Sequence, residues 1–69
     1  MNNGDKVKGN YYGVEFTGVI LNIRPDYSGR GAAEIVTIST DTPIKTPSDV
    51  RSLILINTSF KQMMEVMPA

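Results

Sequence analysis

Apolar and polar residues alternate over short stretches of this chain, and glycine or proline separates one stretch from the next. No stretch keeps apolar residues at helical spacing for three turns, whereas β-branched and aromatic residues cluster between turn signals. This pattern predicts an all-β domain. The expected strands cover residues 4–9, 14–24, 32–40, 50–56 and 63–67.

The second expected strand changes the face that it buries. Its apolar residues fall in two opposite phases on either side of Gly18, with Val14 and Phe16 in the first phase and Val19, Leu21 and Ile23 in the second. A glycine permits a bulge or kink in a strand at small steric cost. We therefore expect all five apolar side chains to be buried and the strand to bend near Gly18.

Residues 47–56 have two competing interpretations. The run Leu53–Ile56 is apolar on both faces, which predicts a strand that is central or buried on both sides. Thr46 as a cap and Pro47 at the first helical position would instead begin a helix. The strand is favoured because this run makes a poor helix surface. The two Thr-Pro pairs within residues 41–49 predict an extended, irregular connection, and residues 57–62 predict one helical or 3₁₀ turn.

The opening stretch GDKVKGNYYGVEFTGVI combines a Gly-Asp start, a charged first strand, a glycine-containing loop and a long strand with an internal glycine. In these features the chain resembles the SH3-like small barrels, including the Tudor and KOW-type modules, although the KOW-type basic signature is absent. The resemblance implies one five-stranded SH3-like barrel over residues 1–69. It also implies a short 3₁₀ turn before the last strand and a second strand shared by two sheets. The short, neutral chain with Asn- and Thr-rich connections is also similar to small bacteriophage-encoded accessory proteins.

The residue types present argue against catalysis and metal binding. The 69 residues include no Cys and no His, which removes disulfides, the two best zinc ligands and the commonest general base. The acidic residues are spread singly, and no nucleophile elbow or Walker-type loop occurs. We therefore expect a non-enzymatic protein without metal or cofactor.

The N-terminal stretch is polar and lacks the apolar segment of a signal peptide. The longest apolar run, Leu53–Ile56, is far shorter than the roughly 20 residues of a membrane helix. These features favour a soluble, cytoplasmic protein without membrane association.

Seven basic and seven acidic residues give a formal net charge of zero. Non-specific nucleic-acid binders normally carry a basic excess, because neutralising phosphates drives their affinity. The charge therefore favours a protein partner. The candidate binding residues lie in or near the first two loops, and they are the aromatic Tyr11, Tyr12 and Tyr27 and the basic Lys6, Lys8, Arg24 and Arg30. Adjacent side chains of an extended segment point to opposite faces, so one of the paired tyrosines is expected to be exposed.

The last expected strand is rich in methionine. Strand alternation places Met64 and Val66 on the face opposite Met63 and Met67, so one apolar face is packed under a loop or docks on a partner or a second copy. The expected function is accordingly protein–protein binding or homo-oligomeric assembly, as in a phage accessory or inhibitor protein. Two alternatives stay open. One is a nucleic-acid-binding barrel that uses the Tyr, Lys and Arg residues of the first loops. The other is an oligomeric small-ligand or nucleotide-binding protein, with residues 27–31 as an anion loop.

Overall fold

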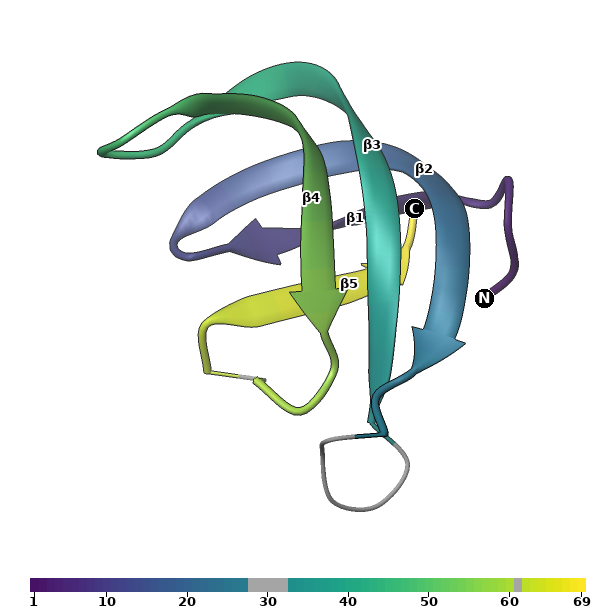
Figure 1. Cartoon of the computed structure of the whole chain (residues 1–69). Coiled ribbons are helices and arrows are strands. Elements are labelled where there is room, and N and C mark those ends of the chain that lie inside the picture. Colours follow the sequence, from purple (N-terminus) through teal and green to yellow (C-terminus); the bar gives the residue numbers. More distant parts are fainter. Residues whose placement is uncertain (28–32, 61) are drawn as a thin grey trace.

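The computed structural model describes residues 1–27, 33–60 and 62–69. Five strands make up the fold (Figure 1): β1 (Lys6–Tyr11), β2 (Val14–Pro25), β3 (Glu34–Lys45), β4 (Val50–Asn57) and β5 (Met64–Pro68). They form one antiparallel sheet in the order β4-β3-β2-β1-β5. The all-β prediction is confirmed, and β4 excludes the helical interpretation of residues 47–56.

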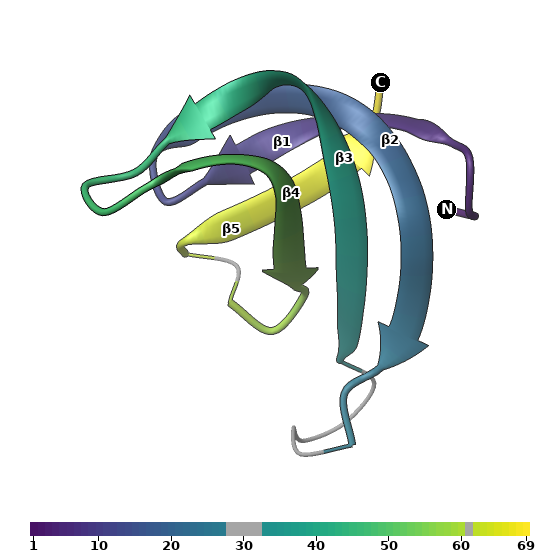
Figure 2. The ribbon, with the colours of Figure 1, turned by 45° about the horizontal axis from the view of Figure 1, so that its top comes forward.

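The sheet is strongly bent. Figures 1 and 2 show that β2 and β3 curve along their length, so that β4 and β5 approach each other across the concave side. Within the described residues, however, β4 pairs only with β3 and β5 only with β1, and the sheet therefore does not close into a barrel. The concave side holds the hydrophobic core, to which every strand contributes: Val7, Tyr11, Phe16, Ile20, Val36, Ile38, Ile44, Ile54, Ile56 and Met64.

The segment between β4 and β5 consists of hydrogen-bonded turns in its described part, and no 3₁₀ helix is present there. The Phe60 amide donates to the Asn57 carbonyl at 3.0 Å, and the Met64 amide donates to the Phe60 carbonyl at 2.8 Å. A turn occupies the predicted place, but not in the predicted 3₁₀ form.

β2 changes its buried face at Leu21. Ile20 pairs with Ile38 of β3, whereas Asn22 pairs with Thr37, so Leu21 is an extra residue on β2. Such a β-bulge moves the following side chains to the other face of the strand. The predicted change of face is present, but it lies three residues beyond the predicted site.

Because the bulge lies at Leu21 and not at Gly18, the buried apolar side chains differ from the predicted ones. Phe16 belongs to the core, and Val19 and Ile23 are half-buried. The prediction is wrong for Val14 and Leu21, which are 37% and 49% exposed. Leu21 projects from the outer side of the sheet, which no second layer of the described fold covers. Val14 shares the phase of Phe16 but lies at the end of β2, next to the β1–β2 turn.

Gly18 serves a different purpose from the predicted bend. A Cβ atom at this position would collide with the Ser39 carbonyl oxygen and would lie 2.8 Å from Cγ2 of Ile38. The missing side chain therefore allows β2 to approach β3 closely.

β3 continues to Lys45, beyond the predicted end at residue 40. Its register with β4 shifts between Ser39 and Ile44, and the residues between them have no partner on β4. Pro43 lies in this irregular stretch, where no β4 pairing needs the N–H that proline lacks. The predicted irregular connection is thus an irregular part of a strand.

β4 is an edge strand with one exposed face, so the prediction that it is central or buried on both sides is wrong. Ile54 and Ile56 are each 1% exposed, whereas Leu53 and Leu55 on the other face are 55% and 50% exposed. A domain with one core layer can bury only one face of this strand.

Candidate functional site

The β1–β2 hairpin has a two-residue loop. Tyr11 pairs with Val14, which leaves Tyr12 and Gly13 between the strands. Their φ angles are 50° and 87°, and positive φ at both central residues is typical of a type I′ turn. The Gly13 amide donates to the Asn10 side-chain oxygen at 2.7 Å. A bulky residue rarely adopts positive φ, so this turn holds Tyr12 in a conformation that costs backbone energy.

The two adjacent tyrosines have different environments. Tyr11 is 8% exposed within the core, and Tyr12 is 56% exposed. Their ring centroids are 4.7 Å apart at an interplanar angle of 84°, an edge-to-face contact. The Tyr12 amide donates to the Met63 carbonyl at 2.7 Å, which ties the hairpin to the segment before β5. The prediction that one tyrosine is exposed is confirmed.

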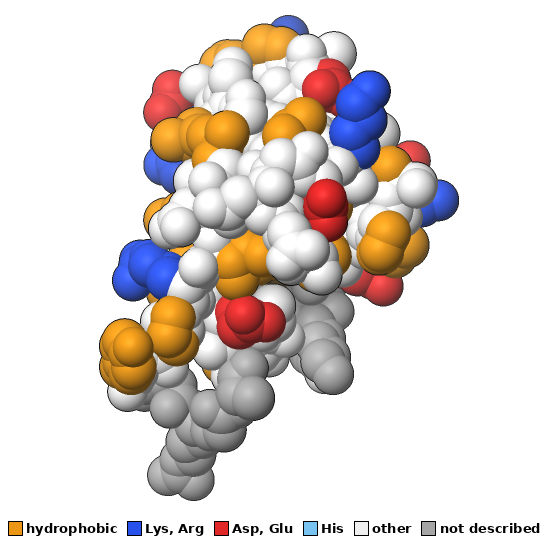
Figure 3. Space-filling view, turned by 90° about the vertical axis from the view of Figure 1, so that its right-hand side faces the viewer, with side chains coloured by type: hydrophobic (Ala, Val, Ile, Leu, Met, Phe, Trp, Pro, Cys, Tyr) orange, Lys and Arg blue, Asp and Glu red, His pale blue; other side chains and the backbone are white. Residues whose placement is uncertain are grey.

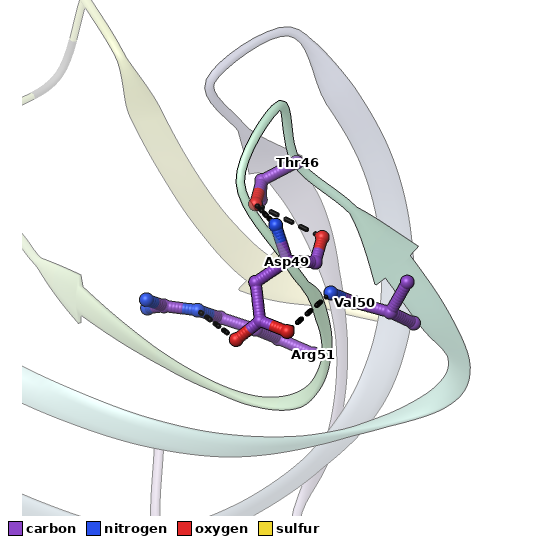
Figure 4. Close-up of polar contacts among 4 residues, drawn as sticks. All are labelled: Thr46, Asp49, Val50 and Arg51. Carbon is purple, nitrogen blue, oxygen red and sulfur yellow. Dashed lines mark hydrogen bonds and ion pairs between the residues drawn. The ribbon is translucent and has the colours of Figure 1, made fainter.

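The β3–β4 hairpin is held by a compact hydrogen-bond system (Figure 4). The Asp49 amide donates to Oγ1 of Thr46 at 3.1 Å, and this hydroxyl donates to the Asp49 carbonyl at 3.0 Å. One carboxylate oxygen of Asp49 accepts from the Val50 amide at 2.7 Å, and the other lies 3.7 Å from Nε of Arg51. These hydrogen bonds hold the turn just before Arg51 and so position the start of β4, from which the Arg51 side chain extends.

A groove of about 330 Å³ lies between the two hairpins, which occupy the same side of the molecule in Figures 1 and 2. Its walls are aromatic, aliphatic and hydroxylated, and two cations border it: Tyr11, Tyr12, Val14, Lys45, Thr46, Pro47, Ser48 and Arg51. Residues far apart in the sequence thus form one concave surface.

The two cations of the groove are available to a ligand. The side chains of Arg51 and Asp49 are 50% and 59% exposed, and an exposed ion pair of this kind contributes little and exchanges readily. Lys45 is exposed, and no ion pair involves it within the described ranges. Sequence analysis did not select Lys45 or Arg51, because only the meeting of the two hairpins brings them beside Tyr12.

The other predicted binding residues do not join this groove. Lys6 and Lys8 lie on the outer side of β1 and are exposed. Arg24 lies at the far end of β2, a 12-residue strand that rises about 3.3 Å per residue, and Tyr27 lies just beyond that end. Tyr27 is 92% exposed. Arg30 and most of the predicted anion loop lie outside the described residues.

Met64 does not offer a docking surface. Its side chain is 8% exposed, and its sulfur accepts a hydrogen bond from the Asn57 amide at 3.4 Å. The loop before β5 leaves Met63 56% exposed instead. The face of β5 that carries Met64 and Val66 therefore packs on this chain's own core.

A second groove, of about 510 Å³, runs over β5, β1 and β2. Asn10 pairs with Glu15 on one side and with Glu65 on the other, so two carboxylates flank one amide. Nearby, Oγ1 of Thr17 donates to a carboxylate oxygen of Asp41 at 2.8 Å. Among the described residues, no three acidic side chains are grouped so that they could hold a metal ion.

Charges of both signs are mixed over the surface. On the face shown in Figure 3, Lys and Arg side chains alternate with Asp and Glu, and hydrophobic patches lie between them. This distribution agrees with the zero net charge and gives no continuous basic path for a phosphate backbone on that face.

Comparisons with protein-family models, with curated proteins and with solved structures found no match to this chain. The part of the chain that the structure describes contains no helix that is long and apolar enough to span a membrane.

Proposed function

We propose that this chain is a non-enzymatic interaction module that binds a short, extended segment of a partner protein in the groove between the two hairpins. The observation that carries the proposal is the exposed Tyr12 side chain, which lies beside Val14 and Pro47 in a groove bordered by Lys45 and Arg51. Tyr and Arg are enriched where protein interfaces bind most strongly. A rigid two-residue turn also limits the conformational entropy that Tyr12 loses on binding.

The groove favours a ligand segment that carries an apolar side chain next to an acidic one. The apolar side chain would pack on the Tyr12 ring and on Pro47, and the carboxylate would meet Lys45 and Arg51. Opposite charges at the rim of an interface mainly accelerate association and select the partner. The volume of the groove is at the low end of the range for ligand pockets, so the groove has room for only a few side chains of a bound segment.

The bent sheet supports an SH3-like architecture that is open between β4 and β5, with the long β2 strand shared by the two halves of the sheet. A small module of this kind would act by occupying a surface of a larger machine, as an accessory or inhibitor protein does. Nothing in its action requires a cofactor.

A random library of 12-residue peptides provides the test. We expect selection on the immobilised protein to enrich peptides with adjacent apolar and acidic residues, and Tyr12→Ala to weaken their affinity about tenfold, as loss of an interface tyrosine typically does. The matched control is Tyr27→Ala, because this exposed tyrosine lies at the far end of β2. Equal effects of the two substitutions, or no enrichment, would contradict the proposal.

A fluorescent oligothymidine is the second probe. Binding that requires Lys6 and Lys8 and weakens steeply with added salt would support the nucleic-acid alternative in place of the peptide groove.

A further inference from the structure

β4 is an edge strand without the usual protection. Edge strands are commonly shielded by charge, by proline or by short length. β5, the other edge, has only five residues and includes the exposed Glu65 and Pro68. β4 has eight residues, and its stretch from residue 52 to 56 contains no charge and no proline. In that stretch Leu53 and Leu55 project outward and are 55% and 50% exposed.

The hydrogen bonds at the end of β4 show which of its amides face the free edge. The Thr58 amide donates to the Glu34 carbonyl on the β3 side, whereas the Asn57 amide donates to the sulfur of Met64, away from β3. Backbone groups alternate in direction along a strand. The amides and carbonyls of Leu53 and Leu55 therefore face the free edge, where the described part of the sheet has no further strand.

We propose that a second copy of this chain pairs with this edge, β4 against β4, in an antiparallel arrangement with a two-fold axis at Ile54. Leu53 of one copy then lies opposite Leu55 of the second copy, and Leu55 opposite Leu53 of the second copy. Both are hydrogen-bonded pairs, because the amides and carbonyls of these residues face the free edge. The two sheets become one continuous ten-stranded sheet.

The sequence of the edge is suited to a second copy. Residues 53–55 read Leu-Ile-Leu, which is symmetric about Ile54, so the same register pairs both exposed leucines. Shifting the pairing by two residues, the smallest step that keeps the faces matched, would place one leucine opposite Arg51 or Asn57. In the proposed register Arg51 lies opposite Asn57 of the second copy, so no like charges meet.

The pairing covers only a few residues per copy, so its area lies toward the low end of specific interfaces, below about 1,200 Å² in total. We therefore expect a reversible dimer with a dissociation constant in the micromolar range. This assembly goes beyond the proposed peptide binding. The paired leucines of β4 do not line the Tyr12 groove, and Arg51 is the β4 residue that borders both surfaces.

Sedimentation of the whole chain over a wide concentration range tests the dimer. We expect the wild type to pass from monomer to dimer, and Leu55→Lys to weaken dimerisation roughly 100-fold, because a two-fold interface contains the substitution twice. The matched control is Leu21→Lys, which alters an equally exposed leucine of β2 away from the edge. A wild-type monomer at all concentrations, or equal weakening by both substitutions, would overturn the proposal.

Two single-cysteine variants test the register, because the chain has no cysteine of its own. Leu53→Cys and isotope-labelled Leu55→Cys chains are mixed under mild oxidation, and the disulfide products are separated by mass. Directly opposed residues lie about 5.5 Å apart between Cα atoms, within the range of a disulfide. We expect the mixed product to exceed either symmetric product several-fold. Predominance of symmetric products would overturn this register.

The peptide selection described above separates the two proposals. Leu55→Lys should retain peptide binding while its dimerisation is weakened, and Tyr12→Ala should retain the dimer while its affinity for the peptide falls. If Leu55→Lys is folded, as judged by its thermal unfolding, and still dimerises like the wild type, the edge-pairing proposal fails while the groove proposal stands.

Discussion

Replacing Gly18 by alanine adds a methyl group where β2 approaches β3 closely. The new Cβ would collide with the Ser39 carbonyl oxygen, and it would lie 2.8 Å from Cγ2 of Ile38 and 3.1 Å from the Ser39 carbonyl carbon. Carbon atoms in proteins pack best at about 3.5–4.0 Å. Two of these three neighbours are backbone atoms, which cannot turn away as the end of a flexible side chain can, so β3 itself must move.

The size of the effect follows from two opposing terms. Forcing extra methyl groups into a well-packed site typically costs about 1–3 kcal/mol. Alanine restricts the unfolded chain more than glycine does, which returns about 0.4–1 kcal/mol where the native conformation is compatible. A net loss of about 1–2 kcal/mol remains, a substantial part of the roughly 3–5 kcal/mol that a core of this size supplies.

Urea unfolding, followed by far-UV circular dichroism, measures this loss. We expect the midpoint to fall for Gly18→Ala and further for Gly18→Val, because the cost grows with the volume inserted. Gly13 supplies the comparison: its φ is 87°, but beyond its two neighbours in the chain no heavy atom lies within 4 Å of an added Cβ. Gly13→Ala should therefore lose about 1–2 kcal/mol from backbone strain alone. A Gly18→Ala stability within about 0.5 kcal/mol of the wild type would refute the close-approach argument, since surface substitutions already fall in that range.

Three further predictions concern the turns and the core. Tyr12→Asn places the residue preferred before Gly13 in a type I′ turn, so thermal unfolding should show a stability that is unchanged or raised by up to about 1 kcal/mol. Fluorescence anisotropy should show that the affinity for the peptide falls, as for Tyr12→Ala. A clear fall in stability would argue against the strained turn. Thr46→Ala removes the hydroxyl that closes the β3–β4 turn and should cost about 1 kcal/mol in urea unfolding, whereas Thr46→Ser should restore it. Met64→Ala should cost about 2–4 kcal/mol as a cavity in the core. The same change at the exposed Met63 should cost far less, and equal losses would place Met64 outside the core.

The strand pattern was predictable from the sequence because alternation and turn residues act locally. The position of the β2 bulge was not predictable from the sequence. One phase of the alternation contains both outward residues, Val19 and Leu21, and the partly inward Ile23. Gly18 lies at the apparent change of phase, but a bulge does not require glycine. The register with β3 decides where the extra residue lies, and that register depends on the partner strand.

The burial of β4 was mispredicted for a related reason. The run Leu53–Ile56 carries apolar side chains on both faces, as buried strands do. Whether the second face meets another layer depends on the whole fold and on assembly. If the proposed β4 pairing forms, the two outward leucines are partly covered by their counterparts, and the apolar pattern has a cause that lies in the dimer and not in the single chain.

The candidate groove was predictable only in part. Adjacent tyrosines in a short loop indicated one exposed ring, and Tyr12 is that residue. Lys45 and Arg51 are more than 30 residues from Tyr12 along the chain, and the bend of β3 brings them to the groove. The two Thr-Pro pairs marked this segment as unusual, but nothing local indicated that its turn would lie beside the first hairpin.

The pairing of β1 with β5 has a consequence for the speed of folding. Val7 pairs with Pro68, and the Ala69 amide donates to the Lys6 carbonyl at 3.2 Å, so this contact closes a loop that includes almost the whole chain. The entropy of that closure must be overcome before the contact stabilises anything, and such non-local pairing slows folding. The hairpins that border the Tyr12 groove are local and can form first, whereas the β5 edge of the sheet depends on a late encounter between the two ends of the chain.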